Sequence, residues 1–469
     1  MRPLCCSARL RRAVPLVRLT ISLAAGSSLG LPTAAESQAP GPARSLTLRE
    51  VLDSALTRHP EAEAARARIQ GARGARTTAG AFGNPMLSYD VENAPFPGGG
   101  PVHGMARESM ITAMLPLETL FQRGPRASRA DAELRAVEAD AFGTWQQLAL
   151  AATRAYFGTA LSQVNVAVAR DLTAWLDSVV TYNRMRVEEG VAAEADLIRT
   201  ELERDRAAAQ LTLREAEHAR MRAELAAFLG DVTTGVPDVL IRIDDTPIPL
   251  PALDGPTGTT VPAAPQVLVA ASPAQLARRP DVRAARERLT AAGAGITAER
   301  SMFVRELGAT FGAKRTAGIT SMVAGVRLPL PIFDPNRGEI ARATAERDVA
   351  ALELSARERS ARAEVAGAYE AARLLTDRAS LLARAADGRP SFLARADEAR
   401  RIALGAYREG AVPLLQVIDA ARAWGDARLT FYEMLYAQHE SVATLLVARG
   451  DDLFIELPLL AARGQGTPR

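Results

Sequence analysis

The chain has 469 residues and a formal net charge of +3, from 57 basic and 54 acidic side chains. Five of its arginines lie in the first 35 residues, which contain no acidic residue, so the rest carries 52 basic and 54 acidic side chains. Because the excess positive charge belongs to the amino end, the composition argues against a nucleic-acid partner. No later stretch holds the roughly 18 unbroken apolar residues that a membrane-spanning helix needs.

Residues 1–35 are predicted to be a secretory signal peptide. Four arginines precede a mostly apolar stretch from Val14 to Leu31, and small residues suited to cleavage follow it. Both cysteines, Cys5 and Cys6, lie in this segment, so we expect no disulfide in the mature chain. They precede the apolar stretch, whereas a lipid-anchor cysteine would follow it, so we expect no lipid anchor.

The sequence contains an internal duplication. Three pairs of segments match at one offset of 220 residues: Leu56–Arg68 with Leu276–Arg288, Glu189–Gly190 with Glu409–Gly410, and Gly230–Asp231 with Gly450–Asp451. Such self-similarity indicates two copies of one structural unit. We therefore divide the mature chain into a first repeat (46–230), a linker rich in Pro, Gly and Thr (231–271), a second repeat (272–453) and a tail (454–469).

Each repeat is predicted to contain a helix, two strands and a long helical hairpin. In the first repeat, residues 126–236 lack proline and are rich in helix-forming residues. Pro125 is expected in the first helical turn, and Gly190 at the hairpin tip. An arm of about 60 residues would be ~90 Å long, which is typical of a coiled-coil-like assembly. The second hairpin is predicted to turn at Gly410 and Pro413, with its first arm interrupted near Gly388.

Alternating side chains predict the strands. Residues 87, 89 and 91 place apolar groups on one face of a strand, while Ser88, Asp90 and Glu92 lie on the other. Residues 307–314 and 320–327 alternate likewise, whereas 109–115 is apolar on both faces. Strands of roughly this length cross a bilayer, but a half-buried soluble sheet alternates in the same way. If these strands span a membrane, several chains must share one barrel, because four strands cannot close one.

On these features the chain resembles the TolC family of outer-membrane efflux channels. The matching segments are Leu46–Leu56 with His59–Pro60, Asn84–Asn93, Leu328–Ile340 and the two hairpin tips. The resemblance implies a mainly α fold with a membrane β-barrel portion. A homotrimer would build a twelve-stranded barrel in outer-membrane lipid, continued by an α-helical tunnel through the periplasm. The strand ending in Glu92 and Asn93 looks most like the cobalt–zinc–cadmium branch.

The family's role is that of an exit duct, not an enzyme, and we expect no cofactor or resident metal. An inner-membrane pump, expected to be of the RND type, would load the duct through a periplasmic adaptor (membrane fusion) protein. The cargo would be metal ions or small toxic compounds. By resemblance, the pore would be constricted at Gln416 and Asp419, where only Asp419 is acidic. Asp196 and Tyr407 match positions that latch helices near the closed end.

The hairpin tips match positions that dock the adaptor. The candidates are Arg186, Gly190, Arg408 and Gly410. Each has a simpler interpretation, since a helical hairpin needs glycine at its turn and the two aspartates can be solvated helix carboxylates. Two other functions remain open: the duct of a protein secretion system, and a periplasmic coiled-coil scaffold capped by the strand pairs. The four histidines lack metal-ligand spacing, and no catalytic constellation supports a hydrolase.

Overall fold

The computed structural model describes residues 44–94, 97, 105–230, 239–241, 248, 273–385 and 390–453. The predicted signal peptide, the tail and most of the linker therefore lie outside the described residues. The contacts divide the chain into Met1–Ala43 and Arg44–Arg469, and every element below belongs to the second unit. Within the described ranges, none of the helices combines the length and hydrophobicity that crossing a membrane requires.

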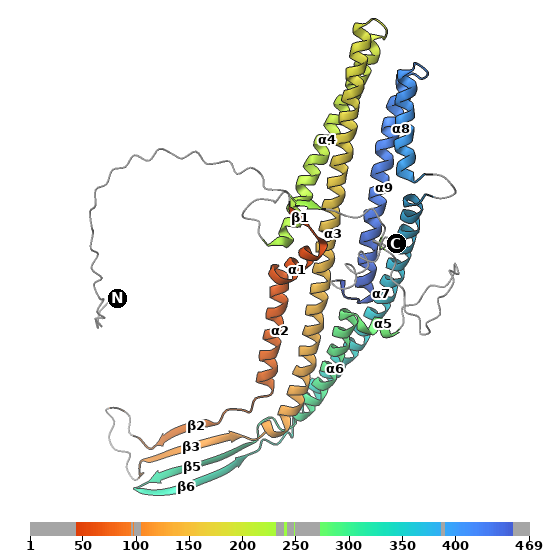
Figure 1. Ribbon diagram of the computed structural model, residues 1–469. Coiled ribbons are helices and arrows are strands. Elements are labelled where there is room, and N and C mark those ends of the chain that lie inside the picture. Colours follow the sequence, from red (N-terminus) through yellow and green to blue (C-terminus); the bar gives the residue numbers. More distant parts are fainter. Residues whose placement is uncertain are drawn as a thin grey trace, which may run out of the picture. The chain divides into compact units, whose positions relative to one another are not determined.

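The first repeat begins with a short strand, β1 (Arg44–Leu46), and two helices, α1 (Leu48–Arg58) and α2 (Pro60–Ala79). The strands β2 (Met86–Glu92) and β3 (Glu108–Pro116) follow, and then the hairpin of α3 (Thr119–Glu188) and α4 (Glu194–Leu229) (Figure 1). Thr47 and Glu50 start α1 with a capping box, in which each side chain binds the other's backbone N–H.

The second repeat follows the same order. After the linker strand β4 (Val239–Ile241), it contains α5 (Pro273–Arg278), α6 (Pro280–Ser301), β5 (Gly308–Thr316), β6 (Ile319–Arg327), α7 (Arg337–Ala383), α8 (Phe392–Arg408) and α9 (Leu414–Arg449). The first arm of its hairpin is interrupted between Ala383 and Phe392, as the glycine and proline there predict. The short strand β4 pairs in parallel with β1, so the segment between the repeats returns to the start of the first.

The duplication is visible in the backbone. Gly190 and Gly410 at the hairpin tips both have φ 73°, and Gly230 and Gly450 at the ends of α4 and α9 both have φ 79°. These positive values are the left-handed conformation that favours glycine after a helix. The two copies therefore turn and end in the same way, although α3 is continuous and its counterpart is split into α7 and α8.

The longest helix is α3, with 70 residues, or about 105 Å at 1.5 Å per residue. It begins earlier than expected, so the prediction that Pro125 lies in the first turn is wrong, and this proline is inside the helix. The reason is the direct connection to β3: the backbone N–H groups of Leu117 and Glu118 donate to the Leu307 carbonyl, and the Thr119 hydroxyl donates to the Pro116 carbonyl. The chain thus leaves the sheet already in position to form a helix.

The four long strands form one antiparallel sheet in the order β2-β3-β5-β6. Leu87, Ala113, Phe311 and Ala324 are aligned across it, and the next level aligns Ser88, Thr112, Gly312 and Val323. The pairing therefore puts the apolar residues of β2, β5 and β6 on one face, as their alternation predicts. For β3, whose face was ambiguous in the sequence, it puts Ile111 and Leu115 on that apolar face and Met110 and Thr112 on the other.

The main core lies where α1, α3 and α9 meet near the middle of α3. Leu52 of α1, Phe157 of α3 and Leu445 of α9 are buried there. Much of the remaining helix contact is made by alanine, for example along α3 and α6. Small side chains let the helix axes approach closely, which suits long parallel packing rather than a thick core.

Candidate functional site

The hairpin tips are built by the same local geometry in both repeats. After α3, the N–H of Gly190 donates to the Val187 carbonyl and that of Val191 to the Arg186 carbonyl, at 3.0 and 2.9 Å. The second tip repeats this arrangement around Gly410. Both glycines are exposed, and no other atom approaches within 4 Å of where a Cβ would be. Each tip is thus a compact helix ending that leaves its turn free on the surface.

A buried chain of hydrogen bonds joins the two hairpins near these tips. The Tyr407 hydroxyl of α8 donates to Asn183 Oδ1 of α3 at 2.7 Å, and Asn183 Nδ2 donates to the Thr200 hydroxyl of α4 at 2.9 Å. That hydroxyl in turn donates to the backbone carbonyl of Asp196 at 2.7 Å. Asn183 and Thr200 are fully buried and Tyr407 is 5% exposed. Buried bonds of this kind are costly to break singly, because each partner left behind has no water to bind.

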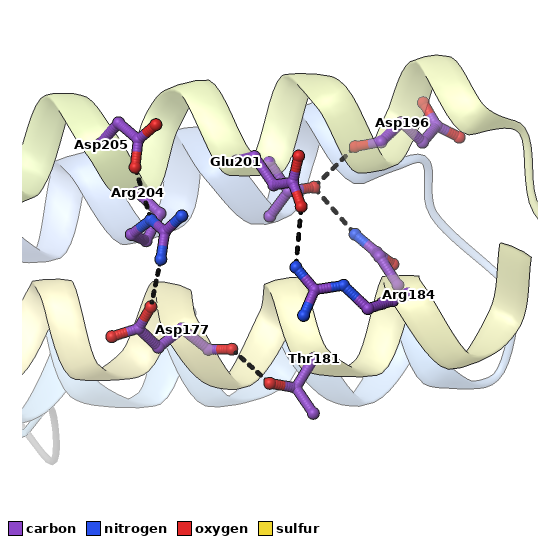
Figure 2. Close-up of polar contacts among 9 residues, drawn as sticks. Asp177, Thr181, Arg184, Asp196, Glu201, Arg204 and Asp205 are labelled. Carbon is purple, nitrogen blue, oxygen red and sulfur yellow. Dashed lines mark hydrogen bonds and ion pairs between the residues drawn. The ribbon is translucent and has the colours of Figure 1, made fainter.

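Asp196 and Tyr407, the two residues expected to latch helices, thus meet in one chain of bonds. The contact uses the Asp196 carbonyl, while its carboxylate points away from α3 (Figure 2). Burial raises the pKa of the Tyr407 hydroxyl, and the Arg186 guanidinium nearby opposes this rise. The hydroxyl therefore stays protonated and remains the donor to Asn183.

Both arginines expected at the docking tips pack against tyrosine rings. Arg186 lies 5.7 Å from the Tyr182 ring and 5.4 Å from the Tyr407 ring, and Arg408 lies 5.9 Å from the Tyr182 ring. The rings of Tyr182 and Tyr407 themselves meet edge to face at 6.1 Å. Arg186 is half-buried by this packing, whereas Arg408 is exposed. Arg408 is therefore the more accessible of the two for a partner protein.

Ion pairs reinforce the first hairpin along its flank. Arg184 of α3 pairs with Glu201 of α4 at 2.8 Å, and Arg204 of α4 pairs with Asp177 of α3 at 3.2 Å (Figure 2). These side chains are about one-third to one-half exposed, so each pair contributes little, roughly 0–1 kcal/mol. Their main effect is on how α3 and α4 are aligned along each other, and their contribution to the free energy of unfolding is small.

Gln416 and Asp419, the residues expected to constrict the pore, lie on one exposed face at the start of α9. The opposite face of the helix is buried through Leu414, Val417 and Ile418. Asp419 is 60% exposed and lies 3.9 Å from Arg422, whose guanidinium also binds Glu203 of α4. Gln416 and Asp419 take no part in the chain of hydrogen bonds around Tyr407. The same face continues into a groove of about 420 Å³ between α3, α4 and α9, lined in part by Arg422 and Asp426.

Sequence reasoning missed Asn183 and Thr200. Their counterparts at the 220-residue offset are Ala403 and Ala420, so the polar connection exists in one repeat only. The available signal was a polar side chain at a helix position whose neighbours on the same face, such as Val179, are apolar. That signal does not reveal the partner, because Tyr407 is 224 residues away from Asn183 along the chain.

The sheet has one exposed apolar face. Five of its large side chains are 48–85% exposed, and they are Leu87, Tyr89, Ile111, Phe311 and Met322. A monomeric soluble protein rarely exposes so many adjacent large apolar groups. The outer strands β2 and β6 pair with no further strand among the described residues. Both features suit a sheet that faces lipid and continues into neighbouring strands.

The described ranges contain no group of three or more His, Cys, Asp or Glu side chains placed to hold a metal ion. His439 is buried against Phe157 and Tyr436, and His59 stacks on Phe228. His103 lies outside the described residues. His59 also accepts a bond from the Glu61 N–H at the start of α2, and His218 is hydrogen-bonded to the Ser162 hydroxyl at 2.9 Å.

A protein-family model described as outer membrane efflux protein matches residues 272–451, the second repeat. Two relatives from Cupriavidus metallidurans extend the match. The cobalt-zinc-cadmium resistance protein CzcC is 25% identical over 411 residues, which cover 87% of this chain and 90% of CzcC. The nickel and cobalt resistance protein CnrC is 28% identical over 320 residues, covering 66% of this chain and 70% of CnrC. The second repeat thus matches the outer membrane efflux protein model, and the chain is similar to CzcC along most of its length.

Solved structures share the fold of this chain. A crystal structure of CusC matches with a TM-score of 0.70 at 19% identity and covers 90% of this chain and 99% of its own. The outer-membrane channel OprN matches with a TM-score of 0.67 at 20% identity and covers 87% and 90%. Both repeats, the sheet and the long hairpins are therefore the common architecture of these outer-membrane proteins.

Proposed function

We propose that this chain is one of three identical subunits of an exit duct through which an efflux pump expels metal cations. The observation that carries the proposal is the sheet, which combines an exposed apolar face with two open edges, β2 and β6. The helix that continues from the sheet, α3, is about 100 Å long. Lipid accepts such a face only when the edges are closed. Three copies would close a twelve-stranded barrel.

The cargo is inferred from the relatives. CzcC and CnrC are named for resistance to cobalt, zinc, cadmium and nickel, and CzcC aligns along most of this chain. A duct need not bind its cargo tightly, so the proposal requires no metal site in the chain. An adaptor would dock at the hairpin tips around Arg186, Gly190, Arg408 and Gly410, and an inner-membrane pump would load the duct through it.

The entrance would be narrowed by Gln416 and Asp419. Three copies of the Asp419 carboxylate around one axis would form a negative ring that attracts cations. Arg422 lies within 3.9 Å of Asp419 and offsets part of this charge. Tyr407 and Asn183 would hold the hairpins in the closed arrangement.

Deletion and complementation in the source cells test the function. Cells that lack the gene should accumulate cobalt, zinc, cadmium or nickel, measured by mass spectrometry, and the wild-type gene should reverse this. A Gly410→Pro variant cannot keep the positive φ of the tip, so it should reach the outer membrane but fail to reverse the accumulation. The matched control is Gly405→Ala, at an open helical position of the same arm.

The alternatives predict other results. Unchanged metal content together with loss of a secreted protein would favour a secretion duct. A chain released from the outer membrane by a high-salt wash would favour a periplasmic scaffold. Normal export by the Gly410→Pro variant would exclude the second tip as a docking point.

A further inference from the structure

Lys314 is the only lysine in the sequence, beside 56 arginines. It lies on β5, two residues before the strand ends at Thr316. The two-residue turn Ala317–Gly318 follows and joins β5 to β6. Lys314 therefore lies near the end of the sheet that is distant from the helices (Figure 1). Arginine is the general cation of this protein, and one position in the sheet carries a smaller, more mobile ammonium instead.

The register places Lys314 among carboxylates. Glu92 of β2 is directly paired with Glu108 of β3. Two residues along the strands, on the same face, Met110 of β3 is paired with Asp90 on one side and with Lys314 on the other. The Lys314 ammonium contacts the Glu108 carboxylate and lies 4.0 Å from that of Glu92. The Thr316 hydroxyl donates to the Glu108 carboxylate at 3.2 Å.

All four charged groups lie on the face opposite the exposed apolar one. Two residues farther along the same face, the hydroxyls of Ser88 and Thr112 meet at 2.6 Å, which shows that this face is the polar side of the sheet. Arg315, the next residue after Lys314, alternates onto the apolar face and is exposed. The polar face at the distant edge therefore holds three carboxylates and one ammonium per chain.

We propose that Lys314 is a tethered counter-cation that sets the ion selectivity of the distal mouth of the duct. This inference rests on the proposed function, because the polar face lines a lumen only if copies of the chain close a barrel. In such a trimer the mouth carries nine carboxylates and three ammonium groups. Each ammonium occupies the Glu92–Glu108 pair, so that a departing divalent cation finds this pair already neutralised.

The consequence is free release of cations at the exit. Two adjacent carboxylates without a counter-charge would hold a divalent cation and slow the ions behind it. A tethered ammonium prevents this while leaving the mouth net negative, so cations still pass in preference to anions. Lysine suits the role because its point charge on a flexible stem can shift between the two glutamates.

Recordings from the purified protein in planar bilayers test the proposal. The variants are Lys314→Gln, the charge-conserving Lys314→Arg, and the control Arg315→Gln, which removes the same charge from the other face one residue away. Lys314→Gln should raise the preference for cations over anions. It should also lower the Cd²⁺ concentration that half-blocks the current from the distal side by about tenfold. Lys314→Arg and Arg315→Gln should behave like the wild type.

Acetylation gives a second test without a substitution. A membrane-impermeant amine reagent on wild-type pores reaches Lys314 and the chain's amino terminus, and it should reproduce the Lys314→Gln behaviour. The Lys314→Arg pores should not respond. Suppose the wild-type pores conduct. If Lys314→Gln then has wild-type selectivity and block, or if Arg315→Gln changes both as much as Lys314→Gln does, the inference is overturned while the duct stands. A wild-type protein that forms no conducting pore would overturn both.

Discussion

Single buried side chains decide how the two hairpins are joined. A chain of hydrogen bonds runs from Tyr407 to Asn183 and from Asn183 to Thr200, and the Thr200 hydroxyl donates to a backbone carbonyl. Their counterparts in the other repeat are Val187, Ala403 and Ala420, which cannot do so. This buried connection therefore occurs once per chain, beside exposed contacts between the hairpins such as Arg422 with Glu203.

Tyr407→Phe should weaken this connection. The change keeps the ring but leaves the Asn183 carbonyl oxygen buried without a donor, which costs about 1–3 kcal/mol. Hydrogen exchange of the backbone amides around residues 183 and 200 should accelerate accordingly. The control is Tyr182→Phe, which also keeps its ring and loses a hydroxyl that donates no bond among the described residues. Equal exchange in both variants would show that the buried chain contributes nothing.

His439 makes the middle of α9 sensitive to acid. Burial lowers its pKa to about 4 from an ordinary value of about 6.5, so the folded helix resists a proton that the open chain accepts. Stability is therefore complete above pH ~6.5 and falls by about 3 kcal/mol as the pH drops toward 4. Hydrogen exchange of α9 amides, corrected for intrinsic rates, measures this loss. In a His439→Leu variant the loss should shrink by that amount, and an identical pH profile would refute the assignment.

At the level of elements, the alternation of apolar and polar side chains along the strands predicts which face of the sheet contacts lipid. Neighbouring residues of β6 provide a matched pair, since Met322 and Ser321 are both exposed and lie on opposite faces. Met322→Arg puts a charge on the apolar face and should cost roughly 2–4 kcal/mol near the bilayer midplane. Ser321→Arg should be tolerated. The measurement is the yield of assembled protein in outer membranes, and equal yields would reject this assignment of faces.

The sequence predicted most of these elements because their signals are local or repeated. Alternation placed Phe311 and Lys314 on opposite faces, and the 220-residue offset paired Gly190 with Gly410. The start of α3 was predicted too late, since the bonds that begin it come from Leu307 in the other repeat. The Asn183 connection and the Glu108–Lys314 contact were missed for the same reason. Contacts between residues some 200 positions apart leave no local pattern.

At the scale of the whole molecule, a single chain is incomplete. Its sheet ends at β2 and β6 without further strands in the described part of the chain. Large apolar groups also remain exposed on the outer helices, including Leu202 and Leu213 on α4 and Leu352 and Leu381 on α7. Copies arranged around one axis would cover both the edges and these helix faces, which is why the proposed duct needs several chains.

The mass of the assembled protein tests this account most directly. Protein extracted from outer membranes in mild detergent should be measured by light scattering, with the detergent contribution subtracted. We predict a protein mass of three mature chains, because three sheets of four strands close the barrel. A stable and folded single chain, or an assembly whose mass is not that of three chains, would contradict the shared barrel and with it the proposed duct.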